Sequence, residues 1–170
     1  MNDKKILKLV FASLMAALAF VATRVFIIPT PMGGYVNAGD CFVLAAGWLL
    51  GPLYGALAAG IGPALADATA GYGMYVIPTF LIKACMAIVA WSLFRAMNGK
   101  RYISVAGIAS ALAAEAVMIA GYYICEAFVF GYGAVASLAS VPGNLVQGAF
   151  GAVVGIALMR IFRRIVGNRL

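Results

Sequence analysis

Long apolar runs, separated by short stretches rich in glycine, proline and polar residues, make up most of the chain. A helix that crosses a bilayer needs about 20 mostly apolar residues. Turn and breaker residues divide the sequence into six candidates of this kind, at 6–28, 38–51, 53–70, 75–97, 103–131 and 142–165. The second and third are short, and only Gly51-Pro52 separates them. Pro63 predicts a kink in the third, because proline removes a helical hydrogen bond. The pattern predicts an all-α bundle of six transmembrane helices.

Composition supports a membrane protein with a single domain over residues 1–170. The chain is 65% hydrophobic and only 10% charged, and its mean hydropathy is +1.05. A soluble domain normally has about a quarter of its residues charged, so this chain has too few charges to cover a water-exposed surface. The first apolar run continues to Ile28, whereas the apolar part of a signal peptide is about 7–15 residues long. We therefore expect a retained first helix.

The basic residues predict the orientation of the bundle. Ten of the twelve lysines and arginines lie before the first helix, around the connection from the fourth to the fifth, or at the C-terminus. The loops at 29–37, 71–74 and 132–141 contain none. The positive-inside rule then places both termini in the cytoplasm, with the protein crossing a bacterial-type plasma membrane several times. Nucleic acid is not an expected partner, because no basic patch is interleaved with aromatic residues.

One lysine, Lys83, lies well inside the fourth predicted helix. At 1.5 Å per residue it is roughly 12 Å below the outer start of that helix. Glu115 in the fifth helix comes to a similar depth when counted from the inner side. Because a charge in hydrocarbon is costly, both side chains should face the bundle interior. We expect either an ion pair between them or contact with a ligand, and the sequence leaves both open.

Polar residues near the outer ends of the helices form a candidate ligand site. Glu115, Tyr122 and Glu126 are spaced to return to one face of the fifth helix. Asn144 and Gln147 are three apart on one face of the sixth, where amides can either bind a ligand or hold helices together. We predict that substrate is bound by residues from four helices: Tyr122, Glu126, Asn144, Gln147, Asp67, Tyr75, Glu115 and Lys83.

Several kinds of catalysis are not predicted. The sequence has no P-loop motif, and it has neither a G-x-S-x-G motif nor any histidine. The three cysteines are widely separated in apolar segments, whereas a metal site needs clustered ligands. We expect a protein that is not an enzyme, binds no metal or cofactor, and has no energy source of its own.

Four sequence motifs resemble the substrate-binding S component of energy-coupling factor (ECF) transporters, closest to the riboflavin-type and related vitamin branch. They are G-x-V-N-x-G-D before the second helix, GP-x-x-G-A-x-x-x-G-x-G-x-x-x-A-D through the third, Y-x-x-P-T-F-x-I-K into the fourth, and PGNLVQG-x-x-G in the sixth. The resemblance implies a six-helix bundle that captures a vitamin or vitamin precursor outside the cell. Riboflavin-type, pyridoxine-type and hydroxymethylpyrimidine-type members share this framework, so the resemblance does not select the ligand.

The same resemblance implies partners and a gate. The loaded S component would dock on a transmembrane T subunit, and two cytoplasmic ATPase subunits would use the ATP. Ala12 and Ala16 occupy the small-residue motif that would contact the T subunit. The loop at 29–37 would be the extracellular gate, with Gly33, Gly34, Tyr35 and Asn37 among its residues. The carboxylates and tyrosines favour a planar ring that is neutral or cationic over an anionic ligand.

A second reading of the sequence is a stand-alone, proton-coupled secondary carrier for a small heterocyclic metabolite. Asp67, Glu115 or Glu126 would then relay protons. Uptake that persists without the T subunit and the ATPases, and that collapses with the proton gradient, would identify such a carrier.

Overall fold

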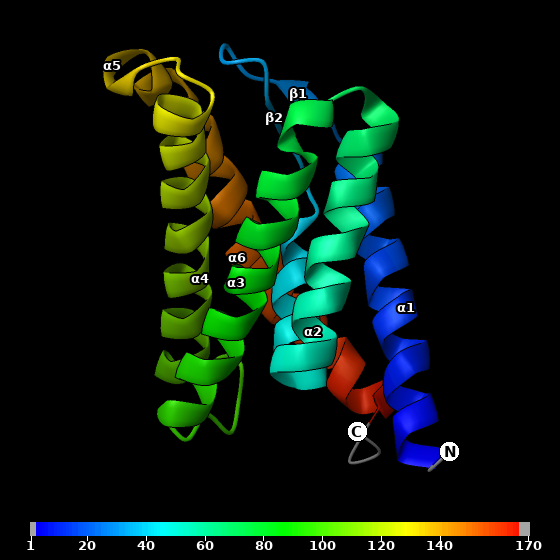
Figure 1. Cartoon of the computed structure of the whole chain (residues 1–170). Coiled ribbons are helices and arrows are strands. Elements are labelled where there is room, and N and C mark those ends of the chain that lie inside the picture. The colour runs from blue at the N-terminus through cyan, green and yellow to red at the C-terminus, as the bar shows by residue number, and fades with distance from the viewer. Residues whose placement is uncertain (1–2, 167–170) are drawn as a thin grey trace.

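A computed structural model describes residues 3–166, which form an α-helical bundle with one short β-hairpin (Figure 1). The long helices are α1 (Asp3–Val25), α2 (Asp40–Ala70), α3 (Val76–Ala96), α4 (Val105–Ile124) and α6 (Val141–Val166). The hairpin consists of β1 (Ile28–Pro29) and β2 (Tyr35–Val36), paired antiparallel. Short helical turns lie at the same end of the bundle as the hairpin (Figure 1): η1 (Gly73–Tyr75), η2 (Cys125–Val129), α5 (Ala134–Ser137) and η3 (Leu138–Ser140).

The prediction of six transmembrane helices is wrong. Among residues 3–166, five helices are long and apolar enough to cross a membrane. The segments predicted at 38–51 and 53–70 belong to one element, α2, which is interrupted at Gly51. The part of α2 before Gly51 has 11 residues, about 16 Å of helix, and this is too short to cross a hydrocarbon core of about 30 Å.

Gly51 redirects the chain within α2. Its φ of 78° and ψ of −172° lie in a region that is essentially restricted to glycine. A Cβ placed on Gly55 would be only 2.6 Å from the carbonyl oxygen of Ala46. Residues nine apart in a straight helix are about 13 Å apart, so the two parts of α2 fold back on each other. This reversal lets α1 begin and α6 end at the same end of the bundle (Figure 1).

Small residues let the helices approach closely in the core. A Cβ on Gly47 would be 2.5 Å from the carbonyl oxygen of Ala87 in α3, and one on Gly62 would be 2.3 Å from that of Ala16 in α1. Close backbone approach of this kind is typical of membrane helices, which gain little from burying apolar surface against each other. Many large apolar side chains face outward, as at Val153 and Ile77, which are 70% and 72% exposed.

Aromatic side chains close the end of the bundle where α3 leads into α4. Phe94 stacks on Tyr102 with ring centroids 4.6 Å apart, and Trp48 lies 5.2 Å from Tyr102. The indole Nε1 of Trp48 donates a hydrogen bond to Ser110 Oγ at 3.2 Å. Ser104 caps the start of α4, where its hydroxyl accepts from the backbone N–H of Gly107. These contacts fix the connection at residues 97–104 against the helices.

Candidate ligand-binding site

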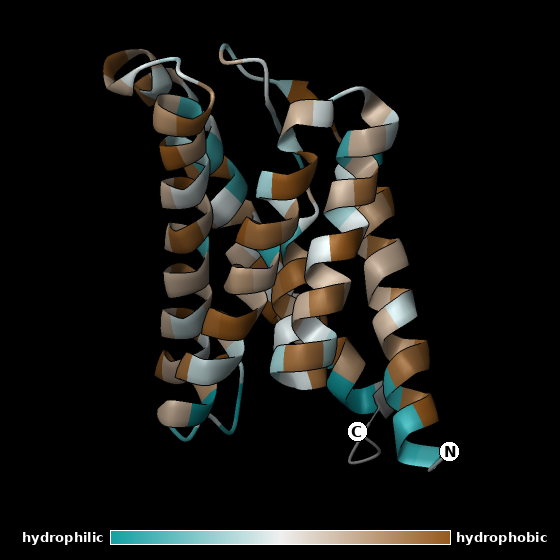
Figure 2. Cartoon of the chain, in the orientation of Figure 1, coloured by the Kyte–Doolittle hydropathy of each residue, from teal (hydrophilic) through white to brown (hydrophobic). Residues whose placement is uncertain are grey.

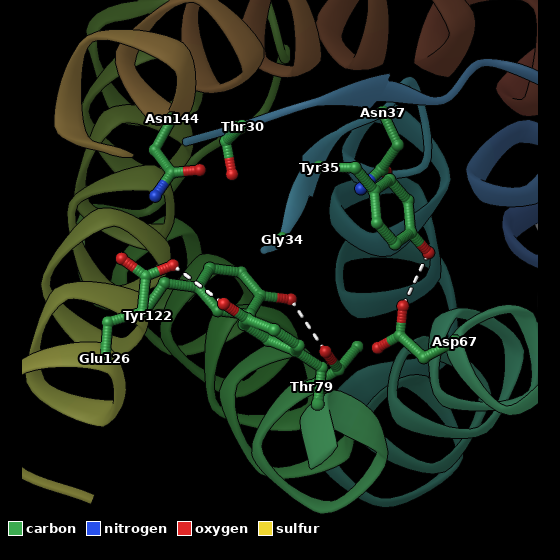
Figure 3. Close-up of a pocket in the computed structure, with 10 residues that line it drawn as sticks. Thr30, Gly34, Tyr35, Asn37, Asp67, Thr79, Tyr122, Glu126 and Asn144 are labelled. Carbon is green, nitrogen blue, oxygen red and sulfur yellow. Dashed lines mark hydrogen bonds between the residues drawn. The ribbon is translucent and has the colours of Figure 1, made fainter. Parts of the chain in front are cut away.

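A cavity lies at the end of the bundle that carries the β-hairpin, beneath the loop between β1 and β2 (Figure 3). Its lining combines hydroxyl, carboxyl and amide groups from residues 30–37 and from six helical elements: α2, η1, α3, α4, η2 and α6. The lining residues are Thr30, Gly34, Tyr35, Asn37, Asp67, Tyr75, Thr79, Tyr122, Glu126 and Asn144. The cavity volume is about 20 Å³, which is room for about one water molecule. A larger ligand requires the lining to move apart.

Each carboxylate of the cavity accepts a hydrogen bond from a tyrosine (Figure 3). Tyr35 donates to Asp67 Oδ1 at 2.5 Å, and Tyr75 donates to Glu126 Oε1 at 3.1 Å. Burial, together with the Asp67 carboxylate, raises the pKa of Tyr35 far above its ordinary value, so this phenol remains a donor at physiological pH. The second oxygens, Asp67 Oδ2 and Glu126 Oε2, are buried and have no partner among the described residues.

Glu126 lies at the cavity on a helical turn that the periodicity of the sequence did not predict. Glu126 lies on η2, a π-helical turn that continues α4. A π-helical turn contains an extra residue, which changes the direction of the side chains that follow it, and such turns are frequent at functional sites. Glu126 and Tyr122 both line the cavity, and Tyr122 also shares a 3.0 Å hydrogen bond with Thr79 on α3.

Lys83 lies just below the cavity and pairs with Asp40, not with Glu115. Lys83 Nζ donates to Asp40 Oδ1, and the two side chains are 1% and 0% exposed. The ammonium group is also 5.4 Å from the centre of the Tyr122 ring, within range of a cation–π contact. The expected pair with Glu115 is therefore wrong. Sequence reasoning missed Asp40 as a partner, although the G-D step that opens α2 was a signal for it.

Gln147 connects this ion pair to the loop above. Its Nε2 donates to Asp40 Oδ2 at 2.7 Å, and its Oε1 accepts from the backbone N–H of Asn37 at 2.8 Å. The Asn37 side chain accepts in turn from the backbone N–H of Gly39 at 2.9 Å. The start of α2, the hairpin and α6 are thus joined by one chain of hydrogen bonds beneath the cavity.

Glu115 is buried between α4 and α6 without a polar partner. It is 3% exposed, and neither carboxyl oxygen has a hydrogen-bond partner among the described residues. Two glycines on α6 leave room for the Glu115 side chain. A Cβ on Gly151 would be 2.6 Å from Glu115 Oε1, and one on Gly148 would be 3.2 Å from Glu115 Cβ.

Comparison with known proteins identifies the family. Residues 3–164 match the sequence profile of the ECF-type riboflavin transporter, S component. The chain belongs to the family of ECF-type riboflavin transporter S components. It is therefore an integral membrane protein, and its family is one of transport components rather than enzymes. The expected family resemblance is confirmed.

Two relatives are similar to this chain over most of its length. This S component is 30% identical over 148 residues to an uncharacterized protein of Pyrococcus woesei, covering 86% of this chain and 95% of that protein. It is 28% identical to the thiamine precursor transporter HmpT of Lactococcus lactis subsp. cremoris (strain MG1363), covering 98% of this chain and 91% of that protein.

Two solved structures share the fold. The S component of a bacterial ECF transporter superposes with a TM-score of 0.74 at 22% identity, covering 96% of this chain and 99% of that one. The S component for biotin from an ECF-type ABC transporter gives a TM-score of 0.66 at 19% identity, covering 94% of each chain.

The predicted site residues of this S component divide into two layers. Asp67, Tyr75, Tyr122, Glu126 and Asn144 line the cavity, together with Gly34, Tyr35 and Asn37 of the predicted gate. Lys83, Glu115 and Gln147 do not line it. Lys83 and Gln147 form the lower layer, and both bond to Asp40. Glu115 belongs to the same layer, because its Oε1 and the Cβ of Asp40 both lie next to Gly151. Thr30 and Thr79 are lining residues that sequence reasoning missed, because a single threonine in an apolar segment carries no distinctive signal.

Ala12 and Ala16 lie in an apolar groove of about 570 Å³ between α1 and the second part of α2. Ala16 also packs inside the bundle, since its carbonyl oxygen meets Gly62. Ser13 and Ala17 line the same groove and are exposed. The small-residue motif thus contributes both to internal packing and to an open face of the bundle.

Proposed function

We propose that this chain is the substrate-capture subunit of an ECF-type importer, and that the cavity beneath the hairpin binds a small planar heterocycle from outside the cell. The observation that carries this proposal is the pair of buried carboxylate oxygens without partners, Asp67 Oδ2 and Glu126 Oε2. A buried acceptor left unpaired is costly. A ligand with two N–H or O–H donors placed around a ring would satisfy both oxygens.

The charges around the cavity favour a neutral or cationic ligand. Asp67 and Glu126 are the acidic side chains of the lining, and the lining includes no lysine or arginine. The nearby cation, Lys83, is paired with Asp40. An anionic vitamin would therefore meet two carboxylates without a free cation to compensate them, and such repulsion opposes binding.

The small size of the cavity and the sequence similarity to a precursor transporter favour a ligand with a single ring, of the vitamin-precursor type. The cavity is small, and tyrosine rings form its walls, with Tyr75 and Tyr122 centred 6.3 Å apart. A pyrimidine requires less displacement of these rings than a three-ring flavin does. The relative HmpT is named as a thiamine precursor transporter, which points to a hydroxymethylpyrimidine-type ligand. Riboflavin is the second candidate, because the matching family profile carries its name.

The hairpin between β1 and β2 serves as the gate in this proposal. Tyr35 on β2 holds it to Asp67, and Gly33, at its tip, has a φ of 72°. Gly34 packs closely against the Tyr75 hydroxyl, 3.1 Å from where its Cβ would be. Because the closed cavity has room for about one water, ligand entry requires this hairpin to lift.

Calorimetric titration of the purified full chain with hydroxymethylpyrimidine, riboflavin and pyridoxine tests the ligand. We expect the pyrimidine to bind most tightly. Asp67→Asn and Glu126→Gln should each weaken binding by roughly 10- to 150-fold, the value of a hydrogen bond to a charged group. Asp3→Asn, an equal loss of charge at an exposed site at the start of α1, is the control. Tight binding of an anionic vitamin, or unchanged affinity in both cavity variants, would contradict the proposal.

Delivery of the ligand would depend on a T subunit docked on the groove that contains Ala12 and Ala16, with two ATPase subunits beneath it. The groove is apolar and lined by small residues, which allow close approach of another helix. Ala12→Leu with Ala16→Leu should abolish copurification with the T subunit while ligand affinity stays within about twofold. Val21→Leu, an enlargement at an exposed site of α1 outside the groove, should change neither.

A further inference from the structure

A second pocket lies at the opposite end of the bundle from the ligand cavity, between the loop before α4 and the last turns of α6. Its volume is about 530 Å³. Four of its seven lining residues are arginines; the full lining is Arg101, Tyr102, Ile103, Met159, Arg160, Arg163 and Arg164. Figure 2 shows hydrophilic residues at this end of the bundle, both in the loop before α4 and toward the end of α6.

The pocket has a defined structure on one side. Arg163 donates a hydrogen bond from Nη1 to the carbonyl oxygen of Lys100 at 2.6 Å, and its guanidinium lies 5.6 Å from the centre of the Tyr102 ring. Tyr102 is held by its stack with Phe94. Burial raises the pKa of Tyr102, so its phenol is neutral and adds no negative charge. Arg163 is thus held against the loop beside the other arginines.

Among residues 3–164, no carboxylate balances these arginines. The chain has five acidic residues, and none of them lines this pocket. Within residues 3–164 the one ion pair is Lys83 with Asp40, far along the bundle. Arg160 and Arg164, one turn apart on α6, are exposed and make no side-chain hydrogen bond within the described residues. Concentrated positive charge of this kind favours an anion supplied from outside the chain.

We propose that this pocket binds the headgroup of an anionic phospholipid. Exposed apolar residues adjoin the arginines along the chain: Ile103 and Ile161 are 48% and 55% exposed, and Val105 at the start of α4 is 76% exposed. Acyl chains can lie on these side chains while the phosphate meets the guanidinium groups. Basic pockets between membrane helices on the cytoplasmic side bind lipid headgroups by the same chemistry.

Native mass spectrometry of the purified full chain, titrated with dioleoylphosphatidylglycerol or dioleoylphosphatidylcholine, tests this proposal. We expect a preference for the anionic lipid. Arg160→Gln with Arg164→Gln should weaken phosphatidylglycerol binding roughly 25-fold, about fivefold for each arginine. Lys4→Gln with Lys5→Gln removes the same charge at exposed sites near the start of α1, and should weaken it by no more than about threefold.

Three results would overturn the proposal. Equal losses in the two double variants would show that the attraction is a diffuse field rather than a pocket. Displacement of the lipid by 10 mM inorganic phosphate would show a site for a soluble phosphate. An unchanged lipid preference in the arginine variant, with loss of copurification with the T subunit or the ATPases, would identify the pocket as a protein contact.

Discussion

The ion pair between Lys83 and Asp40 makes a quantitative prediction about stability. Both side chains are buried, with 1% and 0% exposure. Lys83→Met removes the ammonium group but keeps an unbranched apolar side chain, and Asp40 then keeps the hydrogen bond from the Gln147 amide but has no cation beside it among the described residues. Removing one partner of a buried pair costs about 3–5 kcal/mol. At roughly 2–4 °C per kcal/mol for a chain of this size, the melting temperature should fall by about 6–20 °C.

A double-mutant cycle separates the pair from other effects of the substitution. Asp40→Asn alone leaves the Lys83 ammonium without its carboxylate and should be destabilising in the same way. The double variant Lys83→Met, Asp40→Asn contains neither buried charge, so we expect it to recover at least half of the loss of the single variants. Arg101→Gln, at an exposed arginine of the 97–104 connection, should leave the melting temperature unchanged.

Thermal melts in detergent, followed by tryptophan fluorescence, provide the measurement. Trp48 is 6% exposed and bonds to Ser110, so its emission should change when the helices separate. The reasoning would be refuted if the double variant melted at the temperature that the two single losses predict by simple addition. That result would mean that Lys83 and Asp40 do not stabilise each other.

Three further substitutions test individual contacts. Gly51→Ala should destabilise the fold by about 1–3 kcal/mol, because its φ of 78° disfavours any side chain; thermal melts measure it. Gly151→Ala should cost about 1–3 kcal/mol, since the new Cβ would lie 2.6 Å from Glu115 Oε1, and Glu115→Ala in the same chain should restore part of the loss. Tyr35→Phe removes the hydrogen bond to Asp67 and should speed ligand release about 2- to 12-fold, measured by stopped-flow exchange.

Matched variants serve as controls for these three changes. A Cβ on Gly73 would meet nothing within 4 Å, so Gly73→Ala should leave the melting temperature unchanged. Tyr132→Phe alters an exposed tyrosine of the same end of the bundle that does not line the cavity, and it should leave the release rate as it is. A Gly51→Ala protein as stable as the native one would mean that the reversal within α2 does not need glycine.

The sequence determined the membrane character and most of the helix positions. The predicted segments 6–28, 75–97 and 142–165 differ by only a few residues from α1, α3 and α6, because the length of an apolar run and its breakers are local properties of the chain. Tyr122, Glu126 and Asn144 were expected together near one end of the bundle, and all three line the cavity. Helical periodicity predicts that polar groups one turn apart, such as Tyr122 and Glu126, share a face, but it did not predict the π-helical turn on which Glu126 lies.

Only the tertiary structure decided the partners of those groups. Lys83 and Glu115 come to similar depth by counting along their helices, yet Lys83 bonds to Asp40. The reason is that α2 turns back at Gly51, so its first residues reach the side of α3. A count along one helix gives the depth of a residue but not its neighbour across the bundle. The neighbour depends on how the helices pack, and here the glycines at 47, 62, 148 and 151 allow α2 to approach α3 and α1, and α6 to approach Glu115.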